Sequence, residues 1–205
     1  MRVGGWAMIR LVRVPKSDPA LRRLMPRHYS APKGFVARSI CYLVEDEGQV
    51  WGATVAGSAT RFLPGRTDFF GIEHPLNNLV NNTFFHIEKA DGHYPRRNFA
   101  QKVVRAWRDV VALDWLEKYG DEVLGWETLV ELPRTGEVYL RDGWTVVGTT
   151  KGYTCKRTTG QSTDSWTGRR IWNTNPDELR PKRVFVRQVS DCLASQPMVS
   201  SVSTG

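Results

Sequence analysis

The stretch that decides the fold is residues 97–118, RNFAQKVVRAWRDVVALDWLEK. Its apolar residues recur every three or four positions, which is typical of a helix that lies on a core. The members of this stripe are Ala100, Val103, Val104, Trp107, Val110 and Val111. Asn98 stands at the expected N-cap position, and Gly120 stands where helices commonly end. We therefore predict one long amphipathic helix, with Arg108 among its exposed residues.

Segments with strand character lie on both sides of this helix. Residues 38–46 (RSICYLVED) and 49–60 (QVWGATVAGSAT) are rich in β-formers, and a short acidic connector ending in glycine predicts a hairpin between them. Further β runs are predicted at 6–14, 82–90, 123–132 and 182–189, and another follows the turn pair Asp142-Gly143 within 137–153. Residues 16–34 are expected to be a loop with one helical turn, and 61–78, which is rich in turn formers throughout, a long loop. The order predicts an α+β fold, a mixed sheet with a helix across one face.

Composition limits the class of protein. The chain has 205 residues, 40% of them hydrophobic, and a formal net charge of +8. This favours one globular domain over 1–190 with a loose polar tail at 191–205, and an acidic partner, nucleic acid before a membrane surface. There is no apolar run of about eighteen residues, so no membrane span is expected. The three cysteines form no CxxC pair, which favours a reducing compartment over a disulfide framework or zinc ribbon.

The segment DGHYPRRNFAQK (91–102) connects a predicted strand to the long helix. The first backbone N–H groups of a helix bind anions, and Arg96, Arg97 and Lys102 add positive charge there. Cations at a helix N-terminus oppose the helix dipole unless an anion is present. The segment is therefore a candidate phosphate or pyrophosphate site.

The strand predicted after the helix carries two carboxylates. Alternation places Glu127 and Glu131 on one face and Thr128 on the other. Tyr139 follows after a turn, and a carboxylate beside a tyrosine can act as an acid/base pair. The alternative is that both glutamates lie on a solvated face.

A polar aromatic pair, His28-Tyr29, precedes the predicted hairpin. Imidazole exchanges protons near neutral pH, and tyrosine can donate a proton or stack on a base. The pair is either reactive or a surface feature. The other histidines, together with Glu88 and Asp91, supply nitrogen and oxygen ligands, but their spacing matches no standard metal motif. No nucleophile elbow, Walker motif or GxGxxG is present.

The order of these motifs resembles the GNAT acyl-CoA transferase fold, although RRNFAQK lacks the glycines of the usual pyrophosphate loop. Across about 27–188 the chain is more similar to the Mom-like DNA adenine modification family, and Druantia-type defence proteins share much of the pattern. The segments that carry this resemblance are HYS, RNFAQK, DWLEKYG, ETLVE, YLRDGWTVVGTTKG and RPKRVFVR.

The resemblance implies a function. Mom-like proteins convert adenine in duplex DNA to an N6-carbamoylmethyl derivative that protects phage DNA from restriction, in the host cytoplasm. An acyl-CoA (acetyl-CoA) and an iron are the cofactors that it suggests. The residues that match the family's catalytic positions are His28, Tyr29, Thr128, Glu131 (for an Asp) and Tyr139. Those that match its cofactor loop, with the neighbouring Arg96, are Arg97, Asn98, Ala100 and Lys102.

A duplex-modifying enzyme needs phosphate contacts and an aromatic clamp for a flipped base, for which Tyr29, Trp51, Trp144 or Phe70 are candidates. His28 or Glu131 is the candidate base that takes the proton from the N6 amine. Two other functions stay open: an ordinary N-acetyltransferase acting on protein, tRNA or a small amine, and a non-enzymatic DNA-binding defence or counter-defence protein. The sequence leaves the oligomeric state open, a dimer included.

Overall fold

The computed structural model describes residues 9–35, 38–71, 76–155, 172–173, 177 and 179–189. The helices are α1 (Pro19–Leu24), α2 (Arg66–Phe70), α3 (Phe99–Tyr119) and α4 (Glu137–Arg141), with short 3-10 turns η1 (Met25–Arg27) and η2 (Leu76–Asn78). The strands are β1 (Arg10–Val14), β2 (Ser39–Asp46), β3 (Gln49–Ser58), β4 (Leu79–Ile87), β5 (Gly125–Glu131), β6 (Thr145–Thr149), β7 (Thr154–Cys155), β8 (Trp172–Asn173) and β9 (Lys182–Gln188).

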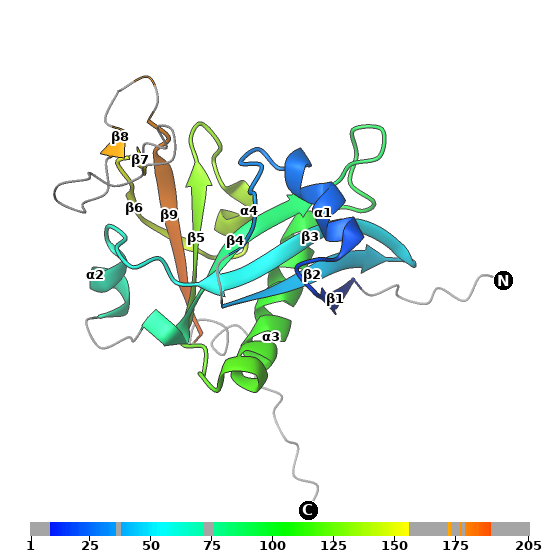
Figure 1. Cartoon of the computed structure of the whole chain (residues 1–205), viewed down its shortest axis with the longest axis horizontal. Helices are drawn as coiled ribbons and strands as arrows, with labels where there is room; N and C mark the ends of the chain where they lie inside the picture. Colours follow the sequence, from blue (N-terminus) through cyan, green and yellow to red (C-terminus); the bar gives the residue numbers. More distant parts are fainter. Residues whose placement is uncertain are drawn as a thin grey trace, which may run out of the picture.

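Seven strands form one sheet in the order β1-β2-β3-β4-β5-β9-β6, and β7 pairs with β8 in a separate ribbon. In the main sheet every neighbouring pair is antiparallel except β4 and β5. The parallel step follows because α3 carries the chain from β4 back across the sheet before β5 begins (Figure 1). The predicted α+β class with a mostly antiparallel sheet is therefore confirmed.

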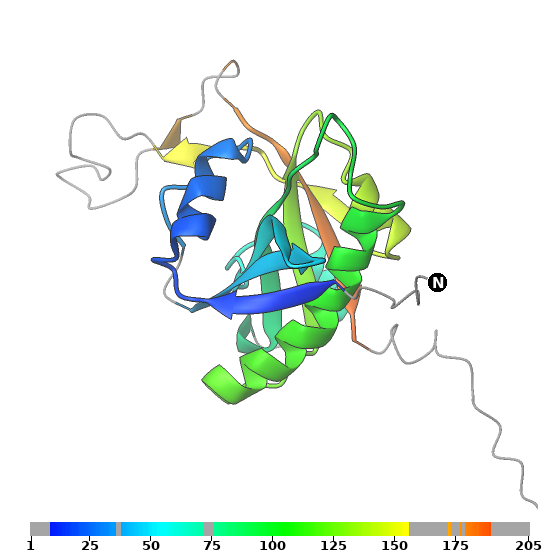
Figure 2. The same ribbon diagram turned by 90° about the vertical axis from the view of Figure 1, so that its right-hand side faces the viewer.

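The helices cover the two faces of the sheet. Alternation along β2 sends Ile40 and Tyr42 into the cluster beneath α3, while Cys41 and Leu43 pack with α1 on the opposite face. Figure 2 shows α1 and α3 on either side of the strands. Tyr139 places α4 on the same side as α3.

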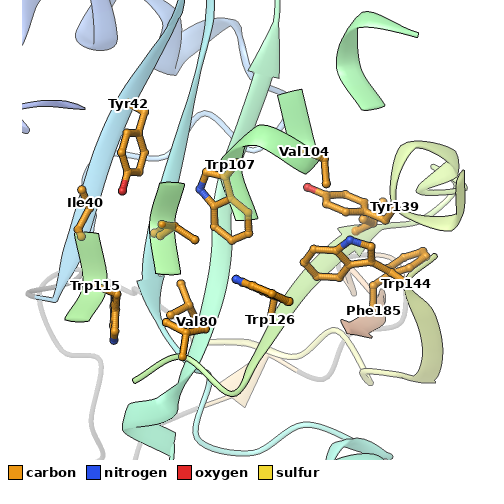
Figure 3. Close-up of a cluster of buried hydrophobic side chains, with 14 residues drawn as sticks. Ile40, Tyr42, Val80, Val104, Trp107, Trp115, Trp126, Tyr139, Trp144 and Phe185 are labelled. Atoms are coloured by element: carbon orange, nitrogen blue, oxygen red, sulfur yellow. The ribbon is translucent and has the colours of Figure 1, made fainter. Parts of the chain in front are cut away.

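The main core lies between α3 and the sheet. Trp107 and Trp115 of α3 pack there with Trp126 of β5, Tyr139 and Trp144, and each of the five is at most 5% exposed (Figure 3). Burying such large rings contributes about 25 cal/mol per Å² of apolar surface removed from water. The predicted apolar stripe of α3 is confirmed by this cluster.

One predicted surface residue of α3 is buried instead. The Arg108 guanidinium, 4% exposed, donates to Asp142 at 2.8 and 3.1 Å, and the Trp144 indole donates to the same carboxylate at 3.0 Å. Helical periodicity alone cannot show a buried ion pair, because the partner comes from the distant α4–β6 turn. This pair ties α3 to that turn.

Three other expectations are corrected. Asn98 stands at the N-cap, but in the left-handed conformation (φ 57°) and with no capping hydrogen bond from its side chain. The segment 61–78, expected to be loop, contains α2 and η2. Tyr139 lies on a short helix rather than directly beyond a turn. The expected hairpin of β2 and β3 is confirmed, as is the left-handed Gly120 that ends α3. The expected tail at 191–205 lies outside the described residues.

Candidate functional site

The site begins where β4 and β5 part. Their parallel ladder runs only from Leu79 to Asn81 on β4 and from Gly125 to Glu127 on β5. At the next position β4 carries a bulge, because Ala56 of β3 pairs with Asn82 and Val55 pairs with Phe84, which leaves Thr83 as an extra residue. A bulge bends its strand and increases the local twist. The bend turns the second half of β4 away from β5 and opens the sheet.

A cavity of about 460 Å³ fills this opening. The second half of β4 and residues 128–130 of β5 form its walls, Ala100 from the start of α3 and Tyr139 from α4 line it, and His28 and Tyr29 reach it from the loop after η1. Four of the five predicted catalytic residues therefore line one cavity: His28, Tyr29, Thr128 and Tyr139. They come from three distant segments that only the tertiary fold brings together.

His28 and Tyr29 stack with ring centroids 4.1 Å apart, and the imidazole also lies 4.9 Å from the ring of Phe84. The Ser30 backbone N–H donates to His28 Nδ1 at 3.2 Å, so the neutral ring carries its proton on Nε2. Burial, aided by nearby His86, lowers the pKa of His28 to about 4. The imidazole is therefore neutral at physiological pH and offers an Nε2–H donor, which makes it a weaker base than the sequence suggests.

Asn82 connects the far wall of the cavity. The Tyr139 hydroxyl donates to Asn82 Oδ1 at 3.1 Å, and the Asn82 amide donates to Thr54 Oγ1 at 2.9 Å. The Thr128 hydroxyl donates to the Asn82 carbonyl at 2.9 Å, just where the backbone ladder of β4 and β5 ends. Burial raises the pKa of Tyr139, which keeps its phenol protonated. Sequence reasoning missed Asn82, whose signal is a polar residue within an apolar strand.

A second cavity of about 970 Å³ adjoins the first and shares Tyr29 and Leu129 with it. Glu131, the fifth predicted catalytic residue, lines this cavity and not the first. Within the described residues, the Glu131 carboxylate has no hydrogen-bond or salt-bridge partner. Glu131 therefore belongs to the second cavity, whereas Tyr139 belongs to the first.

The alternative of a solvated face does not hold for Glu127, the other carboxylate of β5. Glu127 is fully buried and pairs with Arg66 at 2.9 Å, while the Thr60 backbone N–H donates to it at 2.6 Å. Burial raises the pKa of Glu127, against the opposing effect of these donors. This carboxylate holds the loop before α2 and is not free for proton transfer.

The cofactor residues expected at the start of α3 fall into different environments. Ala100 lines the first cavity, and the helix start has no side-chain cap. Arg97 and Lys102 are exposed, whereas Arg96 donates to the Asp46 carboxylate, with one contact at 3.0 Å. The positive charge of Arg96 is thus largely compensated. The backbone of this first turn and the exposed cations are what the segment offers to an anion.

Among the side chains that the structure describes, no three His, Cys, Asp or Glu residues lie close enough together to hold a metal ion. His86 lies 3.5 Å from Glu88, but Arg27 already pairs with that carboxylate at 2.6 and 2.8 Å. Within the described ranges, no helix has both the length and the apolar composition to cross a membrane.

Solved structures share the fold. A Bacillus subtilis acetyltransferase in complex with CoA aligns with a TM-score of 0.55 at 10% identity, covering 88% of this chain and 99% of that one. A GNAT family acetyltransferase from Elizabethkingia anophelis with acetyl-CoA bound gives 0.52 at 9% identity, covering 88% and 98%. An IAA acetyltransferase from Bacillus cereus gives 0.51 at 15%, covering 88% and 99%. No protein-family model and no curated protein matches the sequence.

The chain therefore has the GNAT acetyltransferase fold, as the order of its motifs predicts. The three structures named above are acetyltransferases, so they support the GNAT-like part of the expected resemblance, and the Mom-like and Druantia-type part stays a prediction from the sequence.

Proposed function

We propose that this protein is an acyl-CoA-dependent transferase whose cofactor enters the first cavity. The observation that carries this proposal is the opening between β4 and β5, next to the start of α3, in a fold whose solved examples include complexes with CoA and acetyl-CoA. A cavity of about 460 Å³ is within the range of small-molecule sites. An acyl-CoA supplies an activated thioester.

The residues present fit such a group. Ala100 leaves room beside the uncapped first turn of α3, whose backbone N–H groups suit a pyrophosphate. Arg97 and Lys102 add charge there. Tyr139, held protonated by burial, is placed to give a proton to a leaving group, and the His28 Nε2–H to donate to a carbonyl oxygen. Glu131 is the remaining candidate to take a proton from the acceptor amine.

The acceptor that we propose is an adenine N6 amine in duplex DNA. Its support is the net charge of +8 and the resemblance of the chain to Mom-like proteins. The product expected from that resemblance, N6-carbamoylmethyladenine, has an N–CH₂ bond rather than the amide that direct acyl transfer makes. The two products differ in mass, so nucleoside mass spectrometry on DNA from expressing cells distinguishes them. The iron expected from the resemblance finds no support among the described side chains.

The cofactor part is tested by calorimetric titration with CoA and acetyl-CoA. Ala100→Leu fills the cavity beside α3 and should weaken CoA binding at least tenfold. Ala106→Leu, on the same helix but outside the cavity lining, is the matched control and should bind as the wild type does. Folded wild-type protein that binds neither CoA nor acetyl-CoA would refute the proposal. Binding without any change in host nucleosides would instead favour an N-acetyltransferase with another amine as acceptor.

A further inference from the structure

We propose that the second cavity holds one nucleotide rotated out of duplex DNA, with its amine-bearing base among the aromatic rings of the cavity and its phosphates against the basic rim. This inference rests on the proposed function for its acceptor, and it specifies where and how that acceptor is bound. Of the aromatic clamp expected from the sequence, it keeps Tyr29. Trp144 and Phe70 are buried at 3% and 6% exposure and cannot receive a base.

Three aromatic side chains of this cavity are exposed. Phe62 is 81% exposed, Tyr153 45% and Tyr29 39%. Rings that could be buried in a core but stand in solvent around one cavity mark a binding surface. Bases stack on such rings irrespective of sequence, because every base presents a π-face. The rings suit a planar partner better than a flexible aliphatic one.

Each ring lies under a basic side chain. The Arg134 guanidinium carbon is 3.9 Å from the centroid of Tyr29, Arg61 is 5.4 Å from Phe62, and the Lys151 amine is 5.9 Å from Tyr153. Paired cations and rings are the combination that proteins use on single-stranded nucleic acid, since the ring stacks and the cation meets the backbone.

The charge of the lining fits the same partner. Among the described residues of the lining, Lys151, Arg180 and Lys182 supply three positive charges and Glu131 the one carboxylate. The three positive charges are complementary to the phosphodiesters of DNA. The carboxylate accepts hydrogen bonds from an exocyclic amine, as adenine N6 provides and thymine does not. Because Tyr29 and Leu129 line both cavities, a base held here brings its amine next to the first cavity.

Hydrogen bonds hold the segment before Phe62 in a fixed conformation. Arg66 donates to the carbonyls of Thr60 and Arg61 as well as to Glu127, and Glu127 accepts from the Thr60 N–H. The buried ion pair, which the transfer chemistry does not use, thus fixes both residues before Phe62. A ring on a fixed loop stacks with a smaller entropy loss than one on a free loop.

Binding is tested with a duplex oligonucleotide that carries one 2-aminopurine directly beside an adenine, because the 2-aminopurine loses a stacking neighbour and fluoresces more strongly when that adenine leaves the helix. The full-length wild type should raise the fluorescence without any cofactor. Phe62→Ala and Tyr153→Ala should each weaken this binding roughly tenfold or more. Leu113→Ala is the control: Leu113 is 73% exposed on α3 and lies outside the cavity, so its removal should change nothing. Circular dichroism verifies that all variants are folded.

The inference is overturned if the fluorescence stays flat at saturating protein, or if Phe62→Ala and Tyr153→Ala bind as Leu113→Ala does. It is also overturned if an acidic peptide occupies the cavity and duplex DNA does not compete. Retained CoA binding in any of these cases would leave the transferase proposal standing and remove only the nucleotide site. If the wild type extrudes the base but binds no CoA, the nucleotide site stands and the transferase proposal is removed.

Discussion

The buried pair of Arg66 and Glu127 gives the sharpest test of how this structure is held together. In Arg66→Met the cation disappears while most of the side-chain volume stays. Of its donors in the described part of the chain, the fully buried Glu127 then keeps Thr60 and Asn81. Removing one partner of a buried ion pair costs about 3–5 kcal/mol, because the remaining charge is desolvated without compensation. We expect a loss of this size in the free energy of unfolding near neutral pH.

The loss should depend on pH, with a sign that the structure fixes. Burial already raises the pKa of Glu127, and without Arg66 its pKa rises further. A group whose folded-state pKa is raised contributes its stability below the unfolded pKa and loses it as pH rises through the folded pKa. The penalty of Arg66→Met should therefore be small near the ordinary Glu value of 4.5 and grow toward neutral pH.

Urea unfolding at several pH values, followed by tryptophan fluorescence, measures this penalty against the wild type at each pH. The double variant Arg66→Met/Glu127→Gln carries no buried charge and should restore most of the stability at neutral pH. A loss below about 1 kcal/mol, or a loss that is the same at all pH values, would refute the assignment of a charged, fully desolvated pair. An equal loss in the double variant would attribute the effect to the Thr60 and Arg61 carbonyls instead.

Three further outcomes are expected. The His28 ring should titrate near pH 4 by NMR. Because burial lowers the pKa of His28, the free energy of unfolding of the wild type should fall as the pH drops from 6.5 toward 4. In His28→Gln this part of the pH dependence should vanish. Tyr139→Phe leaves Asn82 Oδ1 without its donor and should cost about 1–3 kcal/mol in urea unfolding while CoA binding persists. Lys182→Gln should lower the slope of log affinity for duplex DNA against log salt by about 0.9, the value for one phosphate contact; an unchanged slope would remove Lys182 from the DNA surface.

Periodicity predicted the parts of the fold that local sequence controls. The stripe of α3 and its glycine end follow from side chains three and four apart, and the β2–β3 hairpin follows from its turn residues. The alternation of β5 was also predicted: Trp126 and Val130 share one face and pack beneath α3, whereas Glu131, predicted on the other face, lines the second cavity. These features depend on neighbours within one or two turns of chain.

The sequence could not predict what depends on partners distant along the chain. Arg108 and Glu127 look like surface charges until Asp142 and Arg66 are placed beside them. Asn98 looks like a cap until its φ angle is known. In each case the side chain's role is set by desolvation and by a partner more than thirty residues away or by a backbone conformation, neither of which composition or spacing encodes.

The sequence by itself determined the α+β class, the long helix and the candidate site residues. Only the tertiary structure decided which of those residues line the first cavity and which line the second. The bulge at Thr83 parts β4 from β5, which creates one cavity for His28 and Tyr139 and leaves Glu131 in a second. The physical reason is that a cavity is a gap between elements: local propensity places the strands, but only their packing and the point where their hydrogen bonds stop create the space.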